Sequence, residues 1–224
     1  MLKLGLDLSL SSIRPQGVWS PDDESSLVAW YQNAVGITLN GSDVSQWADS
    51  SASGYDMVQA TATEQPAYSA GVLTFDSGDT NNLQTSGQVT LTGAFTLGFR
   101  ANPSSTNVVI LADNTSSNEF IKYSTTTKIV VKIGGTTKNL NLDSGTYGDD
   151  YIVIARDGSN VITLYHNGTA QSGTVTLAGS CLIDAIGVRA TDANPYDGTV
   201  EEVQIYSASN ATLIANVNDR LASI

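Results

Sequence analysis

The hydrophobic and polar positions of this chain alternate over short runs, and turn residues separate the runs. Tyr151–Arg156 is apolar and β-branched, and Val161–His166 follows it after an Asp-Gly-Ser-Asn turn. Asn167-Gly168 then reverses the chain again. Asn-Gly between two apolar runs is a strong hairpin signal, because both central residues of a type I′ turn need positive φ. The pattern therefore predicts an antiparallel meander in this part of the chain.

Further runs of the same kind fill most of the remaining sequence. Turn signals separate them at intervals of roughly eight to twelve residues, a spacing typical of β-sandwiches and barrels. The expected strands include Met57–Ala60, Gln65–Tyr68, Val72–Phe75, Gln88–Leu91, Ala94–Ala101, Val108–Ala112, Glu119–Tyr123, Lys128–Ile133 and Thr136–Leu142. We therefore predict an all-β fold in a single domain.

One segment has the period of an amphipathic helix instead. In Ser209–Leu221, apolar side chains recur so that Leu213, Val217 and Leu221 form one stripe. Ser209 or Asn210 precedes the stripe, and both residue types are favoured helix N-caps. The pattern predicts a short C-terminal helix that packs one face against the sheets.

The first ten residues alternate between leucine and other residues. Period two places one set on one face of a strand, and this set is Leu2, Leu4, Leu6, Leu8 and Leu10. Ser11–Asp23, with two prolines and a glycine, is typical of a linker or loop. The leucine strand either completes a sheet of its own domain or adds to a neighbouring subunit as an extended arm. Either way, we divide the chain into an arm and linker, residues 1–23, and one domain, residues 24–224.

The charge balance narrows the classes of partner. The chain has 10 Lys plus Arg against 22 Asp plus Glu, so its net charge is −12 and its pI is near 4.2. Nucleic-acid recognition relies on cations that neutralise phosphates, and anionic membranes attract basic segments. No apolar run approaches the length of a membrane span, and the mean hydropathy is −0.05. We expect a soluble protein that binds neither nucleic acid nor membrane.

The single cysteine and the first residues indicate where the protein folds. Cys181 is alone and lies in a predicted strand, so we expect a buried structural thiol rather than a disulfide or a nucleophile. The start MLKLGLDLSL does not match a signal peptide, because Asp7 interrupts the apolar stretch. These observations predict synthesis and folding in a cytoplasm.

Several segments resemble a known family. A strand ends in Tyr165-His166-Asn167-Gly168, and Gly198–Tyr206 reads Gly-Thr-Val-Glu-Glu-Val-Gln-Ile-Tyr. Together with Leu27–Tyr31 and Val44–Asp49, these motifs resemble a laminin-G-like domain of the concanavalin A-like lectin/glucanase superfamily. The resemblance covers Ser26–Ile224. It implies an antiparallel jelly-roll β-sandwich of two curved sheets, and it says little about function because such domains have many roles.

The superfamily includes glucanases, so a hydrolytic site has to be considered. Glycoside hydrolysis needs two carboxyl groups at a set separation, which family glucanases supply from a Glu-x-Asp-x-Glu strand. This chain has no such run. Adjacent residues of a strand point to opposite faces, so we do not expect Glu201 and Glu202 to work as a pair. His166, the one histidine, lacks a Gly-x-Ser-x-Gly partner motif, and we interpret it as a surface residue at a strand end. The sequence predicts a protein that is not an enzyme.

Two kinds of binding residue remain as candidates. Asp76, Asp79 and Asn82 offer oxygen ligands to calcium in one loop, but they match no defined calcium loop and are also ordinary loop residues, the interpretation we favour. We therefore expect no resident cofactor. Aromatic side chains near turns are candidates to bind glycans, and they are Trp47, Tyr55, Tyr147 and Tyr196.

Two functional hypotheses follow. Laminin-G-like domains occur in bacteriophage virion proteins, which fold in the host cytoplasm and need no export signal. The first hypothesis is therefore a non-enzymatic virion structural protein, a head decoration or a fibre/knob subunit. It would be present in multiple copies or as a homo-oligomer, with residues 1–10 as the contact to capsid or other virion proteins. The alternative is a lectin-like module that binds host surface glycans during attachment, with calcium as an optional ligand.

Overall fold

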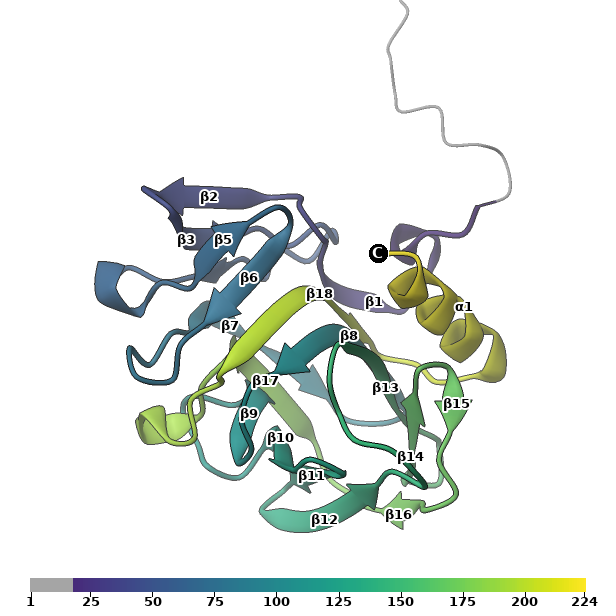
Figure 1. Cartoon of the computed structure of the whole chain (residues 1–224). Helices are drawn as coiled ribbons and strands as arrows, with labels where there is room; N and C mark the ends of the chain where they lie inside the picture. The colour runs from purple at the N-terminus through teal and green to yellow at the C-terminus, as the bar shows by residue number, and fades with distance from the viewer. Residues whose placement is uncertain (1–17) are drawn as a thin grey trace, which may run out of the picture.

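The computed structural model describes residues 18–224, and it forms an all-β sandwich with one helix on its outer side (Figure 1). The leucine pattern of residues 1–10 lies outside the described residues. Two layers of antiparallel strands face each other, and their inner faces hold the main hydrophobic core. This architecture confirms the predicted all-β antiparallel sandwich with a short C-terminal helix.

The first layer is centred on β8 (Phe95–Pro103), which pairs with β13 (Asp150–Arg156) on one side and β18 (Gly198–Tyr206) on the other. The predicted meander forms here, because β13 continues into β14 (Val161–His166). Asn167 and Gly168 then have φ of 49° and 78°, as a type I′ turn requires. The other strands are β1 (Leu27–Tyr31), β5 (Ala67–Ser69), β6 (Val72–Phe75), β15 (Thr169–Ala170) and β16 (Val175–Thr176).

The second layer runs from β4 through to β12. Its order is β4 (Met57–Val58), β7 (Leu83–Leu91), β17 (Cys181–Ile186), β9 (Val108–Ala112), β10 (Phe120–Thr125), β11 (Lys128–Ile133) and β12 (Thr136–Asn141). Within the described chain, β12 pairs with β11 alone and forms the edge. A hairpin of β2 (Ile37–Asn40) and β3 (Asp43–Trp47) joins the two layers at the opposite side, because β3 pairs with both β4 and β5.

Three 3-10 turns connect strands: η1 (Pro21–Asp23), η2 (Ala62–Glu64) and η3 (Ala190–Asp192). Trp19, just before η1, donates from its indole nitrogen to Glu24 and packs against the cluster under the helix. The linker predicted over Ser11–Asp23 is therefore attached to the domain at its C-terminal end.

Aromatic side chains hold the two layers together. The rings of Phe75 and Tyr196 meet edge to face at 5.8 Å, and those of Phe99 and Tyr123 meet in the same way at 6.4 Å. Such edge-to-face pairs are worth about 0.5–1.5 kcal/mol each beyond the area that they bury. The first pair joins β6 to the loop before β18, and the second joins β8 of the first layer to β10 of the second layer. These aromatic contacts therefore form part of the core between the layers.

The helix α1 (Ala211–Ala222) covers the outer face of the first layer (Figure 1). The Asn210 side chain caps it by accepting from the Leu213 backbone N–H at 2.9 Å. Leu213, Val217 and Leu221 form the predicted stripe, and they bury Val153 of β13. No helix of residues 18–224 has the length and hydropathy needed to cross a membrane.

Gly98 of β8 is the point of closest approach between α1 and the sheet. A Cβ atom at this position would lie 2.5 Å from Val217 Cγ1 and 3.2 Å from Leu221 Cδ1. Real Cβ atoms do not tolerate a contact of 2.5 Å, so the helix lies where it does because residue 98 has no side chain.

We predict that Gly98→Ala destabilises the protein by about 1–3 kcal/mol, because the added methyl group overpacks the contact with Val217. Urea unfolding should show a lower midpoint at an unchanged m-value. The control is Gly158→Ala, where a Cβ would meet nothing within 4 Å, and we expect a change below about 0.5 kcal/mol. Equal effects of the two variants would contradict the packing argument.

Candidate functional site

A small cavity opens at one end of the sandwich, between loops from distant parts of the chain. The loop after β8, the β10–β11 turn and the loop before β13 surround a volume of about 80 Å³. The Tyr147 backbone N–H donates to the Thr126 carbonyl at 2.8 Å, and this bond joins two of the three loops. Apart from Pro103, the lining side chains all carry hydroxyl groups: Ser104, Ser105, Thr106, Tyr123, Thr125, Thr126 and Tyr147. The cavity is therefore polar and uncharged.

Two tyrosine hydroxyls of this cavity lack a hydrogen-bond partner among residues 18–224. Tyr123 is 1% exposed and Tyr147 is 9% exposed, and their rings meet edge to face at 5.1 Å. Neither buried hydroxyl is hydrogen-bonded within this part of the chain. A buried hydroxyl without a partner costs about 1–3 kcal/mol. The cost makes this pair the strongest indication of a ligand in the described structure.

Burial also fixes the protonation of the two phenols. Loss of solvent raises the pKa of Tyr123 well above its ordinary value, and neighbouring tyrosines raise it further. Burial raises the pKa of Tyr147 too, and the charge of Asp150 adds to the shift. Both hydroxyls therefore keep their protons at neutral pH, and each offers one donor and acceptor lone pairs.

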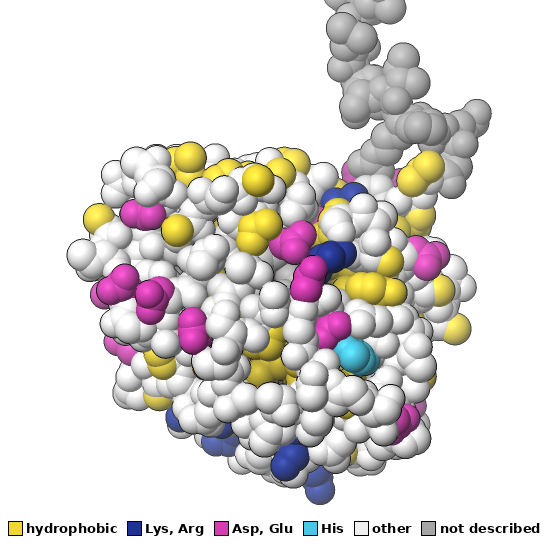
Figure 2. Space-filling model, in the orientation of Figure 1, with side chains coloured by type: hydrophobic (Ala, Val, Ile, Leu, Met, Phe, Trp, Pro, Cys, Tyr) yellow, Lys and Arg dark blue, Asp and Glu magenta, His cyan; other side chains and the backbone are white. Residues whose placement is uncertain are grey.

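His166 supports the cavity from the side. Its ring packs edge to face on Tyr147 at 5.7 Å, and its Nε2 lies 3.0 Å from Asp150 Oδ2. His166 lies at the end of β14, as we interpreted it, but it is only partly exposed and has partners in the preceding loop and strand. In Figure 2 a recess with a hydrophobic floor lies beside the histidine, among mostly uncharged side chains.

Asp150 holds the loop that carries Tyr147. Its carboxylate accepts from Asn167 Nδ2 at 2.6 Å and from the Gly148 backbone N–H at 2.7 Å. Burial raises the pKa of Asp150, but the hydrogen bonds from Asn167, His166 and Gly148 outweigh burial and hold the pKa below its usual value. The group is therefore ionised at neutral pH, and it positions Tyr147 through His166.

The structure separates the four aromatic residues that the sequence suggested for glycan binding. Trp47 and Tyr196 are fully buried, so their placement on a binding surface is wrong: both sit in the core, where they pack on other rings. Tyr55 is half-buried and packs against the core. Only Tyr147 lines the cavity. The sequence missed Tyr123, because a tyrosine that alternates with apolar residues in a strand is indistinguishable from a core residue.

The calcium candidates do not come together. Asp76 Oδ1 accepts from the Gly78 backbone N–H at 2.7 Å within its own loop. Asn82 is buried, and its Oδ1 accepts from Gln59 and Gln84 at 2.8 Å each. Within residues 18–224, Asp79 is hydrogen-bonded to neither residue. Across residues 18–224, no three Asp, Glu, His or Cys side chains are grouped as a metal site requires.

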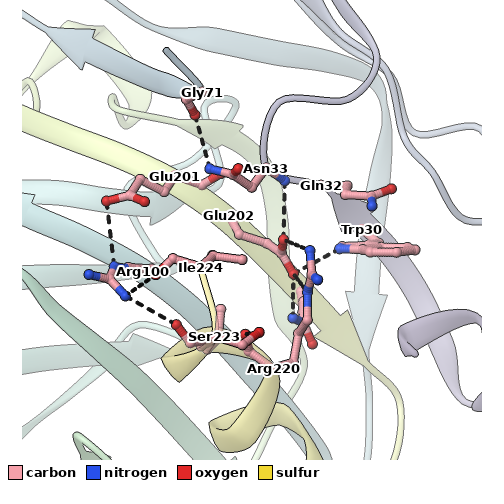
Figure 3. A network of polar contacts seen from close by, with 12 residues as sticks. Trp30, Gln32, Asn33, Gly71, Arg100, Glu201, Glu202, Arg220, Ser223 and Ile224 are labelled. Carbon is pink, nitrogen blue, oxygen red and sulfur yellow. Dashed lines mark hydrogen bonds and ion pairs between the residues drawn. The ribbon is translucent and has the colours of Figure 1, made fainter. Parts of the chain in front are cut away.

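The adjacent carboxylates of β18 face the same side, not opposite sides as we expected. Val200 pairs with Ala101, and Glu202 already pairs with Arg100, so Glu201 is the extra residue of a β-bulge. The bulge turns both glutamates towards the side that α1 covers (Figure 3). Glu201 lies 3.5 Å from Arg100 Nε.

Both carboxylate oxygens of Glu202 accept hydrogen bonds. Oε1 accepts from Trp30 Nε1 at 3.0 Å, from Gln204 Nε2 at 2.7 Å and from Arg220 Nε at 3.0 Å. Oε2 accepts from Arg220 Nη2 at 2.7 Å and from the Asn33 backbone N–H at 3.1 Å (Figure 3). The side chain is fully buried, so the glutamate pair is a structural network with no access for a substrate.

Comparison with known proteins identifies the fold. No family model matches the chain, and no curated protein matches it. The binding domain of botulinum neurotoxin serotype D is 13% identical and covers 88% of this chain and 52% of its own, with a TM-score of 0.54. A second structure is of botulinum neurotoxin type C, whose cell entry depends on interaction with two ganglioside molecules. It is 15% identical and covers 90% of this chain and 52% of its own, with a TM-score of 0.50.

A third similar structure is the Ruminococcus gnavus IT-sialidase CBM40 bound to α2,3-sialyllactose. It is 14% identical over 56% of this chain and 82% of its own, and its TM-score of 0.45 is too low to support an argument. The chain spans about half the length of the neurotoxin structures that it matches. At these identities the likeness shows the fold alone, and it agrees with the predicted sandwich. The laminin-G-like family and a bacteriophage source stay predictions.

We predict that Glu202→Gln lowers the free energy of unfolding by about 3–5 kcal/mol, because it removes one partner of a buried ion pair and leaves Arg220 uncompensated. The matched control is Glu201→Gln, one residue away in a longer and more exposed pair with Arg100, where we expect less than about 1 kcal/mol. Chemical denaturation of both variants measures the difference. A loss at position 202 no larger than at position 201 would refute the structural role.

Cys181 is buried as we expected, and burial raises the pKa of its thiol to about 12. At pH 8 roughly one thiol in 10,000 is ionised at that pKa, so a thiol reagent should label the folded protein very slowly. In 6 M guanidinium the same reagent should label one thiol per chain within minutes. Rapid labelling of the native protein would show that the thiol is accessible.

Proposed function

We propose that this protein is a non-enzymatic glycan-binding module and that the cavity between Tyr123 and Tyr147 holds part of one sugar. The observation that carries the proposal is the pair of buried tyrosine hydroxyls without partners in a cavity lined by hydroxyl groups. Sugar hydroxyls both donate and accept, so they complement tyrosine, serine and threonine hydroxyls that also do both.

The size and charge of the cavity favour a neutral polyhydroxyl group. About 80 Å³ accommodates a few heavy atoms, such as a hydroxymethyl group and its neighbours, rather than a whole oligosaccharide. The lining has no charged side chain, so an ion would be buried there without a partner. The rest of a glycan would then lie along the surface outside the cavity.

The fold gives further support. The similar neurotoxin type C structure is of a protein whose cell entry depends on gangliosides, which are glycan-bearing lipids. A protein that contains a sandwich of this kind therefore depends on a glycan-bearing ligand. A host-attachment role on a virion remains compatible with it. The anchor that the virion hypothesis requires is the leucine pattern of residues 1–10, which lies outside the described residues, so capsid partners and a virion location stay predictions.

A glycan array followed by titration calorimetry tests the proposal. We predict that Tyr147→Phe weakens binding of the best glycan about tenfold, as expected for one hydrogen bond of about 1.4 kcal/mol. Without sugar the same variant should be at least as stable as the parent, because the removed hydroxyl is buried and has no partner within residues 18–224.

The control is Tyr55→Phe, which removes a hydroxyl outside the cavity from a half-buried tyrosine that the sequence also suggested. It should leave the affinity within about twofold. Binding that falls with Tyr55→Phe and not with Tyr147→Phe would place the site elsewhere. An array without a bound glycan would overturn the proposed function.

A further inference from the structure

Several positive charges of this acidic protein gather on one face. Lys122 of β10, Lys132 of β11 and the nearby Arg189 lie around Phe120; we call these four residues the Phe120 face. Alternation sets the orientation, because Ile121 and Tyr123 of β10 and Val131 of β11 occupy the core, so the neighbouring positions 120, 122 and 132 point outward. In Figure 2 a group of dark blue side chains lies at the lower end without magenta side chains among them, whereas the dark blue side chains higher up lie beside magenta ones.

Phe120 organises this cluster. Lys122 Nζ lies 5.6 Å, Lys132 Nζ 5.7 Å and Arg189 Cζ 5.4 Å from the centroid of its ring. Each cation is attracted to the ring by about 0.5–1 kcal/mol at an exposed site, but the cations repel one another. Burial lowers the pKa of Lys122, and the charge of Arg189 lowers it further.

Within residues 18–224 no carboxylate forms an ion pair with these cations. Burial raises the pKa of Glu119, and the charge of Lys132 acts against that shift, so the Glu119 carboxylate offsets only part of the repulsion. The ion pairs found among residues 18–224 involve Arg100, Arg220 and His166, and none involves a cation of the Phe120 face. Uncharged acceptors hold two of the ammonium groups: Lys122 donates to Asn107 Oδ1 and Lys132 donates to the Ser117 carbonyl, each at 2.8 Å. A lysine has three donors, so each retains donors for another group. The face presents fixed cations that an anion would neutralise.

The Phe120 face adjoins the cavity. Lys122 donates to Asn107, which directly follows the cavity residue Thr106, so the cation reaches a loop that lines the cavity. A glycan with one sugar in the cavity would therefore extend next to the cations.

We propose that the Phe120 face binds acidic groups, carboxylate or sulfate, of a polysaccharide whose neutral part occupies the cavity. The inference rests on the proposed function and specifies its ligand class. Lysine and arginine form charge-assisted hydrogen bonds with both kinds of anion. Recognition would then combine a neutral subsite at the tyrosines with a cationic subsite at Phe120.

The test measures binding of the full chain to four polymers: polygalacturonate for carboxylate, dextran sulfate for sulfate, neutral dextran, and oligo(dT) for phosphate. We expect at least one acidic polysaccharide to bind about tenfold or more tightly than dextran, with an affinity that falls as salt rises. Which of the two binds better identifies the acidic group.

Variants then locate the contact. Lys122→Gln and Lys132→Gln should each weaken the acidic polysaccharide about three- to tenfold, and the double variant more. Lys138→Gln is the matched control, because it removes the same charge on β12. Lys138 pairs with the core residue Val131, so its side chain lies on the opposite face of the sheet from Phe120. We expect a change below about twofold, and thermal melting checks that all variants fold.

The outcomes separate the two proposals. Glycan binding that depends on Tyr147, with no gain from acidic groups, would overturn the Phe120 inference and leave the proposed function intact. Acidic polysaccharide binding that depends on the lysines and not on Tyr147 would support the cationic subsite and refute the cavity. Tighter binding of oligo(dT) than of either acidic polysaccharide, or equal losses with Lys138→Gln, would overturn the inference.

Discussion

The buried carboxylate of Glu202 is the constraint on which the placement of helix and sheet depends. Such a group is costly to bury unless its oxygens are bound, and its donors come from β1, β18 and α1 together. Arg220 thereby fixes one turn of α1 over the sheet. Val217 and Leu221 of the same helix can approach the sheet closely because Gly98 has no side chain. The polar network sets the position of the helix, and the apolar stripe supplies the contact area.

This arrangement also determines which surfaces are free for a partner. The helix covers the outer face of the first layer, so the outer face of the second layer and the ends of the sandwich remain open. The cavity at Tyr147 lies at one end, and the cations around Phe120 lie on the open face next to it. The proposed binding residues therefore lie on the side of the molecule that the helix leaves uncovered.

The sequence predicted the fold better than the site, for identifiable reasons. Local signals such as Asn167-Gly168 and the stripe through Val217 depend on only a few neighbouring residues. The turn and the helix that they predict both form in the structure. The cavity depends on loops that the fold brings together, so nothing near Tyr123 marks its hydroxyl as unpartnered. The bulge at Glu201 has no glycine or proline to signal it, and it reversed our argument about the two glutamates.

The exposed edge at β12 has a consequence for the solubility of assembled or concentrated protein. An edge strand presents unpaired backbone groups that can recruit a strand from another chain and begin aggregation. Here the strand is largely polar, and Lys138 stands near its middle. A strand added to this edge would have to bury that ammonium beside its own residues. Lys138 therefore protects the edge of the second layer that lies opposite the β2–β3 hairpin within residues 18–224.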